Sequence, residues 1–135
     1  MPTVDAKNPK RFLYSTNTRY EFQFGYSRAV RHGNVVRVAG TAGLRDDDQV
    51  VSDDVVEQMR AAIARMSKAL EDLGCSLSDV IMTRVYVRNA RDIDSVAVVH
   101  GEFFRDIRPA SMLVEVSRLI DDRALIEIEA DAVVP

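Results

Sequence analysis

The 135-residue sequence lacks the features that mark several classes of protein. It has one cysteine, Cys75, which excludes an internal disulfide framework and is typical of a protein from a reducing compartment. No apolar run approaches the roughly 18 residues that a membrane-spanning helix needs. The polar N-terminus, residues 1–10, has no apolar core of the kind found in signal peptides. We therefore expect a cytoplasmic protein that makes no membrane contact.

The sequence also lacks a large excess of positive or negative charge. The net charge of −3 argues against non-specific attraction to nucleic acid, so a nucleic-acid partner is unlikely on composition alone. The content of 47% hydrophobic and 29% charged residues is that of an ordinary globular protein. The length suits one domain of roughly 100–200 residues. We assign residues 1–19 to a polar, irregular N-terminal arm and 20–135 to a single domain.

Two stretches have the periodicity of amphipathic helices. Residues 54–73 carry one apolar stripe, with Asp54 and Glu57 resembling a capping box and Gly74 as the stop. Asp92 caps the second predicted helix. The stripe of the first consists of Val56, Met59, Ile63, Met66, Leu70 and Leu73, and the buried side of the second of Ile93, Val96, Val99 and Phe103.

Period-two alternation and β-branched residues predict strands elsewhere. The turn at Gly33-Asn34 suits a hairpin between two of them. A further hairpin is predicted over Pro109–Val134, with the polar turn Asp121-Asp122-Arg123. Its second strand places Glu127, Glu129 and Asp131 on one face, which must meet solvent, cations or a ligand. The other predicted strands are residues 20–24, 27–31, 35–39 and 80–88.

The resulting order, β-β-β-α-β-α-β-β, predicts a two-layer α+β domain in which two helices cover one face of a mixed sheet. No further helix is available for the other face, which carries apolar residues beside the acidic row. Packing of this face against copies of the chain would cover it, so we expect a homo-oligomer built sheet to sheet.

The C-terminal part of the chain contains a set of short motifs: Pro109-Ala110, Val114-Glu115-Val116, Arg118-Leu119 and the segment from Ile126 to Ala130. Further motifs lie upstream: Tyr26-Ser27-Arg28-Ala29-Val30, Gly33-Asn34, Gly40, Val85-Tyr86-Val87 and Phe103-Phe104. In these motifs the chain, from about Phe24 to Val134, resembles the RidA proteins, also called the YjgF or endoribonuclease L-PSP family.

The resemblance implies a homotrimer of chorismate-mutase-like subunits, with a small-molecule cleft at each subunit boundary. The activity that it implies is hydrolysis of reactive 2-imino or enamine acids to the 2-keto acid and ammonia, without a metal or organic cofactor. Family members place an arginine directly after Pro-Ala, where its planar fork grips the substrate carboxylate. In this chain that position is Ser111, and the family's serine before Gly40 is Ala39.

Glu127 is the residue that we expect to hold or relay a proton to water, because a cleft between subunits would raise its pKa. An ion-paired surface glutamate is the alternative interpretation. Arg37 and Arg108 are candidate substitutes for the missing arginine. Glu129 and Asp131, about 6–7 Å apart along the strand, suit ion pairs with Arg84, Arg118 or a neighbouring subunit better than a metal site. The expected ligand-binding residues are Tyr26, Ala39, Gly40, Thr41, Ser111 and Leu113.

Two other functions stay open from the sequence. A non-catalytic RidA-fold protein would sense or sequester a metabolite, which the loss of the arginine at Ser111 would favour. A ribonuclease or translation inhibitor is disfavoured by the acidic charge balance. His32, His100 and Cys75 have no partners at recognisable spacings, so we interpret them as structural.

Overall fold

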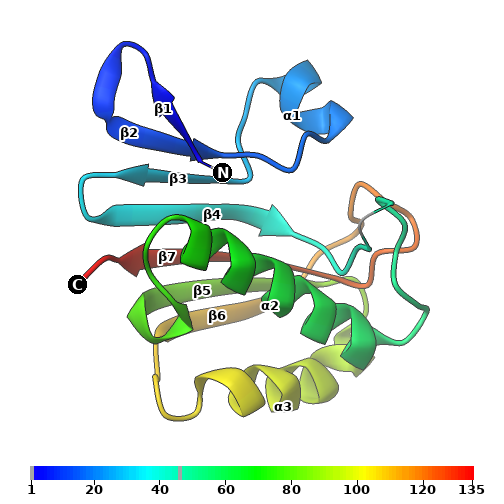
Figure 1. Ribbon diagram of the computed structural model, residues 1–135. Helices are drawn as coiled ribbons and strands as arrows, with labels where there is room; N and C mark the ends of the chain where they lie inside the picture. The colour runs from blue at the N-terminus through cyan, green and yellow to red at the C-terminus, as the bar shows by residue number, and fades with distance from the viewer. Residues whose placement is uncertain (1, 46) are drawn as a thin grey trace.

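The computed structural model describes residues 2–45 and 47–135, in which seven strands form one mixed sheet with two long helices on one face (Figure 1). The strand order is β1-β2-β3-β4-β7-β5-β6. This arrangement confirms the predicted two-layer α+β class. The strands are β1 (Thr3–Asp5), β2 (Asn8–Tyr14), β3 (Ala29–His32), β4 (Val35–Thr41), β5 (Val80–Val87), β6 (Ala110–Glu115) and β7 (Ile126–Val133).

β7 lies in the centre of the sheet, antiparallel to both β4 and β5. Its alternation is as predicted, since Ile126, Ile128, Ala130 and Ala132 are buried while the acidic residues between them are half-buried. Because successive side chains of a strand point to opposite faces, the acidic row lies on the face away from the helices. This face is called the outer face below.

The two predicted helices are confirmed as α2 (Val55–Asp72) and α3 (Ile93–Phe104), which cover the inner face of the sheet. Met59, Ile63, Met66 and Leu70 of the apolar stripe are fully buried. Asp54 accepts a 3.0 Å hydrogen bond from the Val56 amide, so it caps α2 alone, without the expected capping box. Short 3-10 turns, η1 (Leu77–Asp79) and η2 (Ala90–Asp92), flank β5.

The predicted hairpin over Pro109–Val134 is wrong in its pairing. Both strands exist, but β5 lies between them: β6 runs parallel to β5, and β7 pairs with β5 on the other side. The parallel β5–β6 pair is connected through α3, which is the usual crossover for such a pair. Alternation within a strand shows that it is half-buried but does not identify its neighbours.

The predicted irregular arm is also wrong for most of its length. β1 and β2 form a hairpin, and β2 pairs with β3 at the edge of the sheet. The Tyr14 side chain at the end of β2 is buried in the core. Four strands therefore precede α2, where three were expected.

Residues 20–24 form a helix rather than the predicted strand. In α1 (Arg19–Phe24) the Thr18 hydroxyl accepts from the Glu21 amide, while the Glu21 carboxylate accepts from the Thr18 amide at 2.8 Å. This capping box starts the helix, and Gly25, at φ 74°, ends it in the left-handed conformation. The alternating aromatics consequently do not share one buried face, and Phe22 and Phe24 are exposed.

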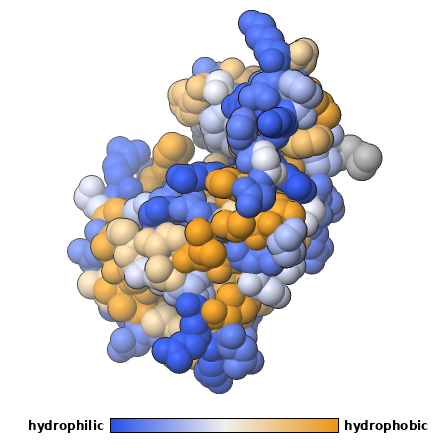
Figure 2. Space-filling view, turned by 90° about the vertical axis from the view of Figure 1, so that its left-hand side faces the viewer, coloured by the Kyte–Doolittle hydropathy of each residue, from blue (hydrophilic) through white to orange (hydrophobic). Residues whose placement is uncertain are grey.

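The surface carries apolar side chains among charged ones. Figure 2 shows such apolar patches, interrupted by hydrophilic residues, on one side of the molecule. On the outer face, Met112 and Val114 of β6 are exposed beside the charged residues of β5 and β7. No helix within the described residues is long and apolar enough to cross a membrane.

Candidate functional site

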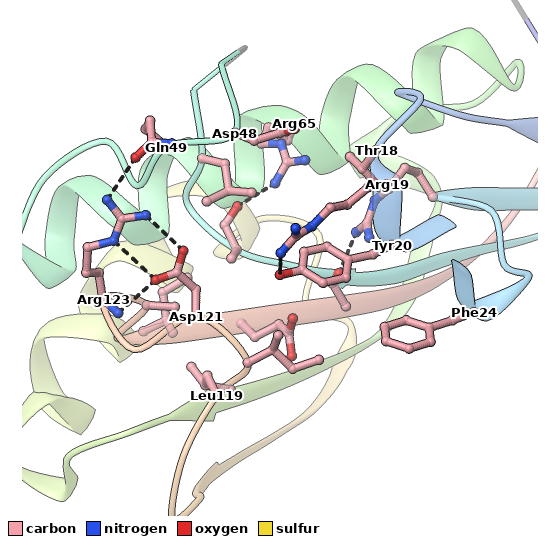
Figure 3. A pocket seen from close by; sticks show the side chains of 18 of the residues that line it. Thr18, Arg19, Tyr20, Phe24, Asp48, Gln49, Arg65, Leu119, Asp121 and Arg123 are labelled. Carbon is pink, nitrogen blue, oxygen red and sulfur yellow. Dashed lines mark hydrogen bonds and ion pairs between the residues drawn. The ribbon is translucent and has the colours of Figure 1, made fainter. Parts of the chain in front are cut away.

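A cleft of about 460 Å³ opens where α1, the end of β4 and the start of β7 meet (Figure 3). The segments before β3, after β4 and before β7 complete its walls, and α2 contributes Arg65. Side chains from both halves of the sequence thus meet around one cavity. Its lining includes Tyr26, Arg28, Gly40, Arg65, Asp121, Arg123 and Glu127.

An irregularity in β4 brings Gly40 against Glu127. Val38 pairs with Ala130 and Thr41 with Ile128, so β4 has one residue more than β7 over this interval. A Cβ added at Gly40 would lie 3.0 Å from Glu127 Cδ. The bulge and the missing side chain together let the backbone approach the carboxyl group closely, at the wall of the cleft.

The surroundings of Glu127 favour its protonated form. Burial raises the pKa of the Glu127 carboxyl, the nearby Arg28 charge lowers it, and the Glu129 charge raises it, with a net upward shift. The sequence-based expectation of a raised pKa therefore agrees with the surroundings of this side chain. Glu127 is a group that can take up and release a proton closer to neutral pH than an exposed glutamate.

Arg28 lines this cleft, although the sequence did not indicate a role for it. Its Nη2 donates to the Gly40 carbonyl and, at 3.0 Å, to Thr41 Oγ1, and so braces the bulge. Its guanidinium carbon lies 5.7 Å from the centre of the Tyr26 ring, and Nη1 donates to the Tyr26 hydroxyl at 3.4 Å. In the sequence, Arg28 is distinguished only by its place in the family-like segment around Tyr26.

Arg65 reaches the cleft from α2. Its Nη1 donates to the Ala42 carbonyl at 2.8 Å, just beyond the end of β4. Burial, and then the charge of Arg28, lower the pKa of this guanidinium. The amphipathic pattern of α2 gave no reason to select Arg65, because only the folded chain brings it to the end of β4.

The segment before β7 forms the opposite wall. Arg123 pairs with Asp121 at 3.1 Å and donates to Gln49 Oε1 at 2.9 Å. Gln58 of α2 is fully buried behind it. The Gln58 amide donates to the carbonyls of Ser52 and Arg123 and accepts from the Leu125 amide, at 2.8, 3.0 and 2.8 Å.

The structure brings only part of the predicted site together within one chain. Tyr26, Gly40 and Glu127 line the cleft, but Ser111 and Leu113 do not. Ser111 Oγ accepts from Thr83 Oγ1 at 2.7 Å, and Thr83 Oγ1 is also 2.8 Å from His100 Nε2, so Ser111 faces the helix layer.

The two residues that flank Gly40 lie beside the cleft and not in its lining. Thr41 is buried, and its hydroxyl donates to the Ala39 carbonyl at 2.8 Å. The same hydroxyl accepts from Arg28. Ala39 and Thr41 therefore shape the bulge and connect it to Arg28.

Neither predicted substitute for the arginine reaches the cleft. Arg37 lies on the outer face, 3.6 Å from Asp131. Arg108 has a left-handed backbone, at φ 56°, after α3, and it does not line the cleft. Within a single chain these two arginines therefore do not contribute to the cleft, and their role at a subunit boundary stays a prediction.

The remaining acidic residues of β7 are held by hydrogen bonds and ion pairs. Asp131 pairs with Arg84 at 3.2 Å, as the sequence predicted, and Tyr86 donates to Glu129 at 2.6 Å. Arg118, the other expected partner, lies 3.9 Å from Asp122 instead. Within residues 2–45 and 47–135, no three metal-ligating side chains gather in one place.

Comparison with known proteins, by sequence and by fold, supports the family resemblance found in the sequence motifs. Residues 16–134 match the family model described as endoribonuclease L-PSP. A crystal structure of a Mycobacterium tuberculosis member of the YjgF/YER057c/UK114 family is 43% identical, covers 92% of this chain and 99% of that one, and superposes with a TM-score of 0.85.

Two further relatives carry names that bear on chemistry. A 2-iminobutanoate/2-iminopropanoate deaminase of Dermatophagoides farinae is 31% identical over 128 residues, which cover 94% of this chain and 98% of the relative. The Escherichia coli protein TdcF, crystallised with bound serine, is 26% identical, with a TM-score of 0.75 and coverage of 82% of this chain and 88% of that one. The chain therefore belongs to the RidA family, also known as the YjgF or endoribonuclease L-PSP family.

Proposed function

We propose that this protein hydrolyses reactive imine or enamine intermediates of small carboxylate- or carbonyl-bearing metabolites to the carbonyl compound and ammonia. The observation that carries the proposal is the position of Glu127, which lies in a cleft against Gly40 with a raised pKa. The name of the Dermatophagoides relative supports the same reaction class.

The reaction needs one group that moves a proton. The protonated Glu127 carboxyl gives its proton to the imine nitrogen, and the resulting carboxylate takes a proton from the water molecule that attacks the carbon of the C=N bond. Glu127 then returns this proton to the nitrogen of the aminoalcohol, the C–N bond breaks and ammonia leaves. The hydroxyl gives its proton to the Glu127 carboxylate as it becomes the carbonyl, so that Glu127 ends in its starting state. An enamine first takes a proton on carbon to become the imine. These steps use no metal or organic cofactor.

We further propose a homotrimer in which the outer faces of three sheets pack together. The exposed Met112 and Val114 beside the paired charges of the outer face support this arrangement. In such a trimer the cleft of one chain would border a neighbouring chain, and Ser111 and Leu113 could belong to a site that no single chain completes. We place the protein in the cytoplasm, in keeping with its single buried cysteine.

A second candidate function is non-catalytic sensing or sequestration of such a metabolite. The specific observation in its favour is Ser111, which stands where the family has its carboxylate-gripping arginine and is hydrogen-bonded to Thr83. A ribonuclease function is disfavoured by the net charge of −3.

The test generates 2-imino acids in place with an amino-acid oxidase and follows the imine that survives with a trapping reagent. The native protein is expected to shorten the lifetime of the imine, and Glu127→Gln to lose at least about 100-fold of this activity. Glu102→Gln, which removes an exposed carboxylate of α3, is the matched control and should be unchanged.

Ser111→Arg separates the two candidate functions. If the native protein leaves the imine untouched and Ser111→Arg gains activity, the sensing function is correct. If Glu127→Gln keeps full activity, the proposed role of Glu127 is wrong. Cleavage of RNA by highly purified protein would revive the ribonuclease alternative.

A further inference from the structure

Arg28 and Arg65 lie at the wall of the cleft as two guanidinium groups without acidic partners. Both donate to oxygens of the β4 end, Arg28 to the Gly40 carbonyl and Thr41 hydroxyl and Arg65 to the Ala42 carbonyl. Neither forms an ion pair with any carboxylate of residues 2–45 and 47–135. Arg123, at the opposite side of the cleft, differs because it is paired with Asp121.

Two half-buried like charges that share one wall are unfavourable unless an anion joins them. The pKa of Arg65 is lowered first by burial and then by Arg28, which is the electrostatic sign of this repulsion. Glu21 and Asp48 act on Arg65 only through space. The backbone carbonyls orient the guanidinium groups but are neutral, and Glu127 and Glu21 interact with the Arg28 charge through space without forming an ion pair with it.

A second cavity, of about 120 Å³, adjoins this wall. It is also lined by Arg28 and Arg65, together with the hydroxyl-bearing Tyr14, Thr16 and Thr41 and with Lys68. No carboxylate lines it. Hydroxyl and guanidinium donors around a small cavity are the groups that bind a carboxylate or phosphate.

We infer that Arg28 and Arg65 form a receptor for an oxyanion of the ligand, where the small cavity meets the cleft. The inference rests on the proposed function for the identity of the cleft and adds the two residues that recognise the anionic group of the ligand, a carboxylate or a phosphate. Arg65 has Nε and Nη2 free of hydrogen bonds within the described part of the chain, and these are the donors available to the anion. Arg28 and Arg65 would thus bind the negative charge of the ligand, which the neutral Ser111 cannot do.

The test measures equilibrium binding of three probes by calorimetry: 2-oxobutanoate, its neutral amide and inorganic phosphate. Native protein should bind at least one anion, and Arg65→Gln should weaken that binding about tenfold or more. Arg28→Gln should act in the same direction. Arg60→Gln, which removes an exposed arginine from the same helix, is the matched control and should change binding less than about twofold.

The probes distinguish the sources of the anion. Preference for 2-oxobutanoate over its amide identifies a carboxylate receptor, and preference for phosphate identifies a phosphate receptor. Equal binding of the anions by native protein and Arg65→Gln, or no anion bound by the native protein, overturns the inference. Arg65→Lys, which keeps the charge but loses the fork, should bind at an intermediate level if Arg65→Gln proves unstable.

Failure of the proposed function gives a different result. Glu127→Gln should lose turnover and keep anion binding. If anion binding depends on Arg65 but the protein shows no turnover, the hydrolase function is wrong and the anion receptor is supported. If Arg65→Gln keeps turnover with an unchanged KM, the anion receptor is wrong and the hydrolase function is supported.

Discussion

Gly40 lies so close to Glu127 that a Cβ at position 40 would come within 3.0 Å of Glu127 Cδ. The contact exists because β4 carries one extra residue beside β7 at this point. Arg28 holds the same bulge through the Gly40 carbonyl and the Thr41 hydroxyl. The position of the candidate catalytic carboxyl group therefore depends on the bulge in β4 and on Arg28, the residue directly before β3.

Gly40→Ala tests this dependence. The added methyl group would push the Glu127 carboxyl aside by a few tenths of an ångström, and imine hydrolysis should fall by about tenfold or more, because misplacement of a reacting group is costly. The melting temperature should change little, since the side chain can move. Gly101→Ala in α3, where the nearest atom is Arg105 Nη2 at 3.7 Å, is the control and should retain activity.

The raised pKa of Glu127 predicts a pH dependence of stability. A carboxyl group whose pKa is higher in the folded than in the unfolded state binds its proton more tightly when folded. It therefore destabilises the fold as pH rises from the unfolded value, 4.5, through the folded value. Glu127→Gln should be more stable than the native protein at pH 8, and the difference should shrink as pH falls below 5. Urea denaturation at several pH values measures it, and a difference that grows toward low pH would contradict the assignment.

The sequence was sufficient for the elements whose pattern is local. The stripe from Val56 to Leu70 and the alternation from Ile126 to Ala132 gave α2 and β7 with their buried faces, because periodicity reports burial directly. Predictions from the sequence were wrong where the structure of a segment depends on its strand partner or on one side-chain contact. The partner of β6 is β5 because α3 crosses over, and residues 19–24 are helical because Thr18 and Glu21 cap each other.

The candidate site likewise contains residues that the sequence predicted and residues that only the structure identified. Glu127 and Gly40 were found through a family-like motif, and the structure places them in contact. Arg28 and Arg65 were not selected, because they are separated by more than thirty residues and each resembles an ordinary surface arginine in sequence. Only the fold brings both guanidinium groups to the end of β4.

Gln58 should be a major contributor to stability. Its fully buried amide satisfies two carbonyls and the Leu125 amide, and so ties the segment before β7 to α2. Gln58→Met keeps the volume but leaves those backbone groups unpaired, which should cost about 2–4 kcal/mol. Chemical denaturation measures the loss. Gln23→Met, at an exposed position of α1, is the control and should stay within about 0.5 kcal/mol.

The outer face of the sheet is the surface through which we expect copies of the chain to associate. Met112 lies beside Arg84 in the register of β5 and β6, and Arg84 is paired with Asp131 on this face. If three outer faces pack together, the native protein should have three times the 15.1 kDa mass of the chain in light scattering or sedimentation. Met112→Glu would bury in that contact a further carboxylate beside Arg84, which already pairs with Asp131, at a cost of several kcal/mol, and should dissociate the assembly.

Val98→Glu provides the matched control for this experiment. Val98 is 62% exposed on α3, in the layer on the opposite side of the sheet, whereas Met112 is 38% exposed. The same change of residue to glutamate at position 98 should therefore leave the mass unchanged. A native protein that runs as a monomer, or dissociation by Val98→Glu but not by Met112→Glu, would show that the outer face is not the surface through which copies of the chain associate.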